Sequence, residues 1–259
     1  MAEPAPQTIT INGCAVSYRR VGHGPTLLYL HGAGGAYDWA PFLARLAEGH
    51  DLIVPEHPGF GRSDTPPWLD GIEDLAYYVL EFAEALDLQE VHVVGSSLGG
   101  WIAMEAAVRG FPRMRSLTLS CAAGVRVPGV PVADPFLWNR EQQLRALLHD
   151  PALAAAAIAR EPTPEQAEIE LKNRYAFARV AWEPRLHNPN LKKWLHRIRV
   201  PTQVLWGAND RLLPLALGEE IARRIPGAGL RVIPDCGHLP QIERMEAWVA
   251  AVAGFIAEQ

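Results

Sequence analysis

An apolar run that ends in Gly-x-Ser-x-Gly constrains the fold of this chain more than any other feature. The run covers residues 91–95, and Gly95, Ser97 and Gly99 form the pattern. Small residues at helical spacing follow at once, so the segment predicts a strand that turns sharply into a helix. Glycines on both sides of the serine let the two backbones approach closely, and the turn lifts the hydroxyl above the sheet edge. Ser97 is therefore a candidate nucleophile.

Strand-like and helix-like segments alternate along most of the chain. Asn12-Gly13 indicates a two-residue hairpin turn between segments 7–11 and 15–18. Further strands are expected at 26–30, 51–55, 91–95, 115–120, 202–206 and 230–233, and helices at 42–46, 72–86, 98–109, 215–225 and 245–256. This alternation predicts an α/β fold, with a mostly parallel twisted sheet, helices on both faces and an antiparallel opening hairpin.

Residues 124–197 interrupt the alternation and contain no strand-like segment. Thr163-Pro164 is typical of a helix start, and Gln166 completes a Thr-x-x-Gln capping box. A helical insertion after a sheet strand is best explained as a lid over the carboxyl edge of the sheet, where ligands bind in open α/β folds. An ordinary peripheral subdomain is the alternative. The expected units are a core of residues 1–123 and 198–259, an inserted lid of residues 124–197, and lid helices near 139–148, 151–160, 164–182 and 189–196.

Composition limits the classes of partner. The 259 residues, 49% of them hydrophobic, are enough for one large core. A net charge of −5 gives no electrostatic case for binding nucleic acid or an anionic membrane surface, and no apolar stretch reaches membrane-spanning length. The first residues do not resemble a secretory signal, and the widely spaced Cys14, Cys121 and Cys236 indicate free thiols in a reducing compartment. We expect a cytoplasmic monomer or homodimer that binds small molecules, unless a leader peptide has been removed.

A serine hydroxyl is barely ionised at neutral pH, so Ser97 needs a base within hydrogen-bond reach and a third group that orients the base. Asp210 and His238 each follow an expected strand, which places both at the same sheet edge as the serine. Asp235 competes with Asp210, but it lies too close to His238 along the chain to approach the ring from behind. The order Ser97, Asp210, His238 is the order used by the α/β-hydrolase fold.

Attack on an ester carbonyl generates an oxyanion, and hydrogen-bond donors must already point at it. The amide of Leu98 follows the nucleophile at the positive end of its helix. The glycine-rich loop after strand 26–30 can turn a second amide inward, and Ala33 is the expected donor. His31 is expected to support this loop by hydrogen bonding rather than to titrate during catalysis.

Pocket walls are expected from the lid and from the residues just past the oxyanion loop. Ser96 precedes the nucleophile, and its position is equally compatible with lining the pocket and with packing. No His/Cys cluster has zinc-ligand spacing, and no metal or organic cofactor is expected. The expected substrate-binding residues are Gly32, Gly34, Tyr37, Ser96, Phe136 and Trp138, with Trp39 as a further wall.

With these elements in place, the chain resembles small single-domain serine esterases of the α/β-hydrolase superfamily. The resemblance covers nearly the whole chain, and it implies the fold, the triad and carboxylic ester hydrolysis. One departure is Glu56, where the family usually has Asp, and this changes a turn rather than the chemistry. The motifs are His31-Gly32-Ala33-Gly34, His57-Pro58-Gly59-Phe60-Gly61-Arg62-Ser63-Asp64, Gly95-Ser96-Ser97-Leu98-Gly99-Gly100, Trp206-Gly207-Ala208-Asn209-Asp210 and Gly237-His238-Leu239-Pro240.

Departures from related families narrow the expected chemistry. The serine nucleophile excludes epoxide hydrolases and haloalkane dehalogenases of this fold, which use aspartate. Meta-cleavage-product hydrolases, which break carbon–carbon bonds, are similar in length and lid, but they usually show Trp after the catalytic His, where Leu239 stands here. Only Arg174 and Arg179 are loose candidates for their substrate-binding lid arginine. The sequence favours a carboxylesterase for small to medium, mainly apolar esters. A carbon–carbon hydrolase and a non-catalytic small-molecule receptor on the same scaffold are the alternatives.

Overall fold

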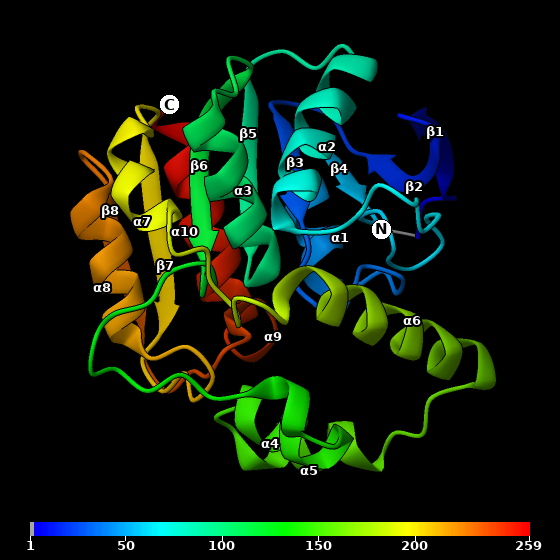
Figure 1. The fold of residues 1–259 in the computed structure, drawn as a ribbon, viewed down its shortest axis with the longest axis vertical. Helices are drawn as coiled ribbons and strands as arrows, with labels where there is room; N and C mark the ends of the chain where they lie inside the picture. The colour runs from blue at the N-terminus through cyan, green and yellow to red at the C-terminus, as the bar shows by residue number, and fades with distance from the viewer. Residues whose placement is uncertain (1–2) are drawn as a thin grey trace.

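The computed structural model describes residues 3–259. A twisted eight-stranded sheet forms its centre (Figure 1). The strand order is β1-β2-β4-β3-β5-β6-β7-β8. β2 pairs antiparallel with β1 and β4, and the other neighbours pair parallel, so the predicted α/β fold is confirmed. The strands are β1 Gln7–Ile11, β2 Cys14–Val21, β3 Thr26–Leu30, β4 Asp51–Pro55, β5 Val91–Ser96, β6 Met114–Ser120, β7 Thr202–Gly207 and β8 Gly229–Ile233.

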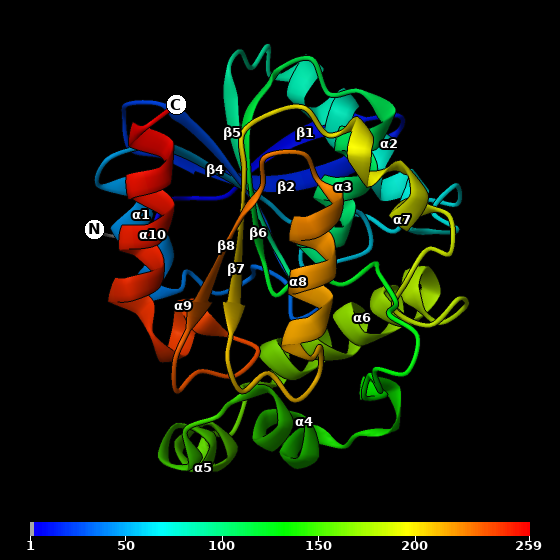
Figure 2. The same ribbon diagram turned by 90° about the vertical axis from the view of Figure 1, so that its left-hand side faces the viewer.

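Helices cover both faces of the sheet (Figure 2). α1 and α10 lie on one face, and α2, α3 and α8 lie on the other. Because both faces are covered, the central strands read as short, nearly continuous apolar runs. The helices outside the segment between β6 and β7 are α1 Pro41–Ala47, α2 Ile72–Ala85, α3 Leu98–Arg109, α8 Leu215–Arg224, α9 Pro240–Glu243 and α10 Met245–Ala257.

Strand β3 shows how the core is divided between the two faces. Leu28 and Leu30 pack into a large cluster that includes side chains of α2 and α3. Leu27 and Tyr29 point the other way, into a second cluster that includes side chains of α1 and α10. All four side chains are buried, and each such burial contributes about 1.5–3 kcal/mol of hydrophobic stabilisation.

The opening hairpin follows the turn chemistry of Asn12 and Gly13. Both residues have positive φ angles, 46° and 73°, as the tight turns of two-residue hairpins require. β1 and β2 pair directly across this turn, so the predicted hairpin is confirmed. β2 extends further than predicted, to Val21, because its second half pairs with β4.

Most of the segment between β6 and β7 lies beyond the carboxyl ends of the parallel strands, whereas its last helix, Leu191–Trp194, lies back beside α3, towards the amino end of β7 (Figures 1 and 2). The Thr163 hydroxyl accepts the Gln166 amide at 3.2 Å, and the Gln166 side chain accepts the Thr163 amide at 3.1 Å, so the predicted capping box is confirmed. The position agrees with the expected lid, and its role as a lid rather than a peripheral subdomain stays a prediction. The segment contains a 3-10 turn at Pro135–Leu137, α4 Arg140–Leu147, α5 Pro151–Ala159, α6 Pro164–Ala181 and α7 Leu191–Trp194.

Two further findings concern the sequence expectations. Cys14, Cys121 and Cys236 are free, as predicted, and all three are buried. Within residues 3–259, no helix is both long enough and apolar enough to cross a membrane. The cellular location and the oligomeric state stay predictions.

Candidate active site

Ser97 lies at the sharp turn between β5 and α3. Its φ of 54° is unusual for a residue with a side chain, and such strain is typical of functional turns. Two glycines allow the close approach. A Cβ atom at Gly95 would lie 2.5 Å from the Gly99 carbonyl oxygen, and one at Gly99 would lie 2.0 Å from the Leu30 carbonyl oxygen. The strand, the turn and the helix therefore have the geometry of the predicted nucleophile elbow.

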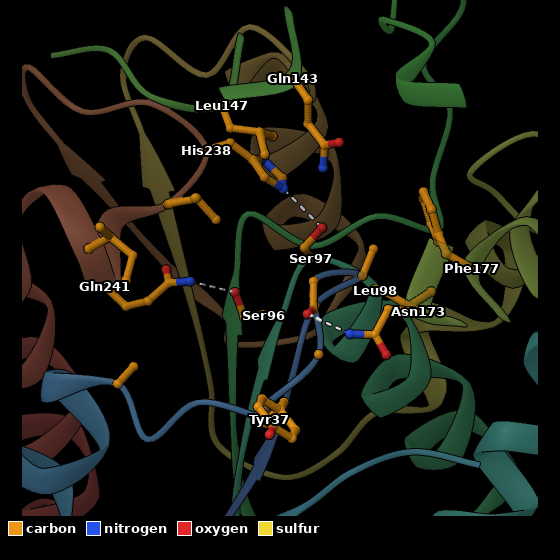
Figure 3. Close-up of a pocket in the computed structure, with 18 of the residues that line it drawn as sticks. Tyr37, Ser96, Ser97, Leu98, Gln143, Leu147, Asn173, Phe177, His238 and Gln241 are labelled. Carbon is orange, nitrogen blue, oxygen red and sulfur yellow. Dashed lines mark hydrogen bonds between the residues drawn. The ribbon is translucent and has the colours of Figure 1, made fainter. Parts of the chain in front are cut away.

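The structure brings Ser97, His238 and Asp210 together at one edge of the sheet, and Figure 3 shows the contact between Ser97 and His238. The Ser97 hydroxyl lies 2.9 Å from His238 Nε2, and His238 Nδ1 lies 2.7 Å from Asp210 Oδ2. Two backbone amides, of Leu212 and Leu213, donate to the other carboxylate oxygen at 2.9 and 2.8 Å. With Nδ1–H donating to the carboxylate, the free lone pair of Nε2 faces the serine hydroxyl. This is the arrangement that serine activation needs.

Asp235, the competing carboxylate, is exposed and outside this chain of hydrogen bonds. Cys121 lies against Asp210, and its Sγ, a carboxylate oxygen of Asp210 and a His238 ring nitrogen lie within 4.8 Å of one another. Burial raises the pKa of the Cys121 thiol well above its ordinary value, which disfavours the thiolate that metals bind. The same carboxylate and imidazole are already hydrogen-bonded to each other, so the cluster is better suited to proton transfer than to metal binding.

The loop that carries His238 is held by hydrogen bonds to the end of α4 and to Glu243. The His238 backbone amide donates to the Leu147 carbonyl at the end of α4, at 2.8 Å. The Glu243 carboxylate, 7% exposed, accepts the amides of Gly237, His149 and Asp150 at 2.5, 2.6 and 2.8 Å. One buried carboxylate therefore connects the histidine loop to the segment between α4 and α5.

Ala33 and Leu98, the expected oxyanion donors, both line the cavity at Ser97. Neither backbone amide hydrogen-bonds to another described residue, so both are free to bind a ligand. Leu98 begins α3, whose positive dipole end favours a developing negative charge. In the loop that contains Ala33, the next residue, Gly34, accepts a hydrogen bond at its carbonyl from the Asn173 side chain, at 2.9 Å (Figure 3).

His31 supports the oxyanion loop, as expected. Its Nδ1–H donates to the Gly32 carbonyl at 2.7 Å, and its Nε2 accepts the His57 amide at 3.0 Å. Burial lowers the pKa of His31 from 6.5 to about 4. Burial and the neighbouring His31 also place the pKa of His57 well below its ordinary value. Both rings are therefore neutral near pH 7 and act as fixed hydrogen-bonding groups.

The cavity at Ser97 has a volume of about 360 Å³ and mainly apolar walls. Polar side chains line it at separate points, among them Gln143, Asn173 and Gln241. Asp38 and Glu170 add carboxylates, whereas no Lys or Arg of the described chain lines the cavity. The Arg174 guanidinium is exposed and donates to the Trp138 carbonyl, and Arg179 pairs with Asp70 at 3.4 Å.

Four of the six expected substrate-binding residues line the cavity: Gly32, Gly34, Tyr37 and Ser96. The other two expectations, Phe136 and Trp138, are wrong, because neither lines the cavity and Pro135 and Phe177 do so instead. Phe136 is turned into a stack with Phe177, with ring centroids 4.7 Å apart. Trp39 is also absent from the cavity wall and packs against the cluster that contains α1 and α10.

Sequence reasoning missed Asn173 and Gln241. Asn173 lies on the same face of α6 as Ile169, Ala176 and Val180, so a polar residue in an apolar helical stripe was a readable signal. Gln241 lies three residues after His238, in the first turn of α9, and only the position of that short helix reveals that its side chain reaches the cavity.

Comparison with known proteins agrees with this geometry. A family model described as alpha/beta hydrolase fold matches residues 25–245. A 2-hydroxymuconate semialdehyde hydrolase of Pseudomonas putida is 32% identical over 253 residues, which cover 92% of this chain and 89% of that protein. A 2-hydroxy-6-oxo-6-phenylhexa-2,4-dienoate hydrolase of Burkholderia cepacia is 29% identical and covers 96% of this chain and 95% of its own length.

Among solved structures, an esterase from Exiguobacterium antarcticum superposes with a TM-score of 0.78 at 19% identity, over 98% of this chain and 100% of that chain. At this identity the likeness concerns the fold alone. The family match, however, spans most of the sequence, and the first relative exceeds 30% identity over nearly the whole length. The chain belongs to the α/β-hydrolase family.

Proposed function

We propose that this protein is a carboxylic ester hydrolase for small to medium, mainly apolar esters that carry no carboxylate. The observation that supports it best is the hydrogen-bonded chain Ser97–His238–Asp210 at the wall of a largely apolar cavity that no described Lys or Arg lines. Residues 124–197 serve as the lid that completes this cavity.

The proposed reaction passes through an acyl-enzyme. Ser97 Oγ attacks the ester carbonyl carbon while His238 Nε2 takes the hydroxyl proton, and Asp210 stabilises the resulting imidazolium. The amides of Ala33 and Leu98 bind the oxyanion. The imidazolium then gives its proton to the leaving alcohol oxygen as the carbonyl–oxygen bond breaks. A water molecule, deprotonated by the same nitrogen, attacks the acyl carbon. The bond between this carbon and Ser97 Oγ then breaks, the imidazolium returns its proton to Oγ, and the carboxylic acid is released.

The charges around the cavity favour neutral substrates. A substrate carboxylate must leave water to enter an apolar site, and it does so favourably only opposite a cation or several donors. Asp38 and Glu170 line the cavity with the same sign of charge, and Arg174 and Arg179 are directed elsewhere. A neutral ester has no charge to desolvate, and the two carboxylates do not repel it.

A carbon–carbon bond hydrolase is the second candidate, and the relatives favour it. The names of the P. putida and B. cepacia hydrolases denote substrates that are carboxylates. A serine activated by His238 can attack the ketone carbonyl of such a substrate as it attacks an ester carbonyl. The two candidates therefore differ in the group that the cavity must accept rather than in the nucleophile.

A direct comparison of substrates separates them. We expect kcat/KM of the purified protein for p-nitrophenyl butyrate to exceed its value for 2-hydroxy-6-oxo-6-phenylhexa-2,4-dienoate by at least about tenfold, with both activities lost in Ser97→Ala. Preferred cleavage of the dienoate would establish the carbon–carbon hydrolase instead. Stoichiometric release of p-nitrophenol without turnover would favour a receptor on a hydrolase scaffold.

A further inference from the structure

One side of the cavity contains a polar group that the proposed reaction does not use. Gln241 is 6% exposed and lines the cavity, and its Nε2 donates to Ser96 Oγ at 3.3 Å (Figure 3). Its Oε1 is buried and has no hydrogen-bond partner within residues 3–259. A buried amide oxygen without a donor is unfavourable, and such atoms are rare in folded proteins.

The side chains around Gln241 fix its amide at the cavity wall, so the unpaired oxygen belongs to a defined site. Ser96 is buried and accepts the Gln241 amide, and Tyr29, on the adjacent strand β3, lines the same cavity beside it. The other side chains nearby are apolar: Phe42 and Leu43 line the same cavity. Ser96 therefore holds the amide at its nitrogen, and the amide oxygen is the atom left without a partner.

The position of the Gln241 amide relative to Ser97 indicates that it contacts one end of a bound substrate. Ser96 directly precedes Ser97, and Figure 3 shows Gln241 and Ser96 on one side of Ser97, with Asn173 and Phe177 on the opposite side. An ester bound at Ser97 thus extends one arm towards the amide and the other towards the phenyl ring. A hydrocarbon arm leaves Oε1 unsatisfied, whereas an arm with a hydroxyl or N–H group satisfies it.

We infer that Gln241, held by Ser96, is a specificity subsite for a hydrogen-bond donor, a hydroxyl or N–H group, on one arm of the ester substrate. The inference rests on the proposed ester hydrolysis and narrows its substrate class. Sites built to pair a polar group of the substrate discriminate strongly against analogues that lack it, because the buried partner is then left without a hydrogen bond.

Matched ester pairs test the inference. One pair places the donor on the acyl arm (p-nitrophenyl 6-hydroxyhexanoate against p-nitrophenyl hexanoate), and the other places it on the alcohol arm (4-hydroxybutyl butyrate against butyl butyrate). We expect kcat/KM to favour the hydroxylated member of at least one pair by about tenfold or more in the wild type. Gln241→Leu should bring that ratio close to one, whereas the exposed, distant Gln89→Leu should leave it unchanged.

Equal kcat/KM within both pairs in the wild type, or an undiminished preference in Gln241→Leu, would overturn the inference. If no ester is turned over, the hydrolysis proposal fails by itself. Calorimetric binding of the same pairs to Ser97→Ala then decides the subsite: tighter binding of a hydroxylated member supports it, and equal binding within both pairs overturns it.

Discussion

Asn173 allows a sharp test of how the helical segment controls the reaction. The residue lies on α6 and is 3% exposed. Its Oδ1 accepts the Gly61 amide at 2.8 Å, and its Nδ2 donates to the Gly34 carbonyl at 2.9 Å. Gly34 follows Ala33, the expected oxyanion donor. The side chain therefore fixes the orientation of the loop whose amide must face the oxyanion.

The two hydrogen bonds give the size of the expected effects. Asn173→Ala leaves the buried Gly61 amide without a partner, at about 1–3 kcal/mol, and removes the bond to the carbonyl of the exposed Gly34, at about 0.5–1.5 kcal/mol, so unfolding should become easier by roughly 1.5–4.5 kcal/mol. Asn173→Asp keeps the acceptor for Gly61 but places a carboxylate oxygen against the Gly34 carbonyl. Loss of one oxyanion donor lowers kcat by about 10²–10³. Displacement of the loop should therefore lower kcat of Asn173→Asp by about ten- to a hundredfold, with KM changed less than about threefold.

The assay is steady-state hydrolysis of p-nitrophenyl butyrate, with thermal unfolding measured in parallel. Lys172→Met is the matched control, because Lys172 docks the same helix onto the same turn by donating to the Gly61 and Ser63 carbonyls at 2.9 and 2.6 Å. This variant should lower Tm and leave kcat within about threefold. An unchanged kcat in Asn173→Asp, or an equal loss in Lys172→Met, would refute a specific role of Asn173 in placing the oxyanion loop.

Three further results are expected. Ser97→Ala should lower kcat on aryl esters by several orders of magnitude with an unchanged circular dichroism spectrum, and a near wild-type rate would remove Ser97 from the mechanism. Burial of His31 should contribute about 3 kcal/mol of stability that is present above pH 6.5 and lost as the pH falls to 4, because burial lowers the pKa of His31 from 6.5 to about 4 and only the unfolded chain is protonated in this window; the lowered pKa of His57 adds a loss in the same direction. Urea titrations in which His31→Asn retains the whole pH dependence would contradict this. Glu243→Gln should lower kcat about tenfold, since an amide NH2 then faces a backbone donor in the loop of Gly237 and His238, and unchanged kcat and Tm would show that the carboxylate does not hold that loop.

The fold and the three central side chains were predictable because their signals are local. Ser97 directly follows β5, and Asp210 and His238 lie three and five residues after the ends of β7 and β8. Parallel strands of one sheet bring their carboxyl ends to a common edge, so the sheet itself supplies the long-range proximity. The hairpin at Asn12-Gly13 was equally local, because its backbone angles select those residue types.

The cavity wall was harder to predict because it depends on how the segment between β6 and β7 folds back. Phe136 and Trp138 are large and apolar, but the 3-10 turn at Pro135–Leu137 directs the Phe136 ring towards Phe177 instead of the cavity. Nothing in residue type or spacing sets that direction. A polar residue on an apolar helix face, as at position 173, carries more information than an aromatic residue in an irregular segment.

The formation of an acyl-enzyme on Ser97 is the central claim, and rapid-quench mass spectrometry tests it most directly. With excess p-nitrophenyl butyrate, the intact wild-type protein should gain the mass of one butyryl group, located on the peptide that contains Ser97, together with one equivalent of p-nitrophenol. Ser97→Ala should show neither. Turnover of the ester without any adduct at Ser97, or an adduct on another residue, would contradict the account.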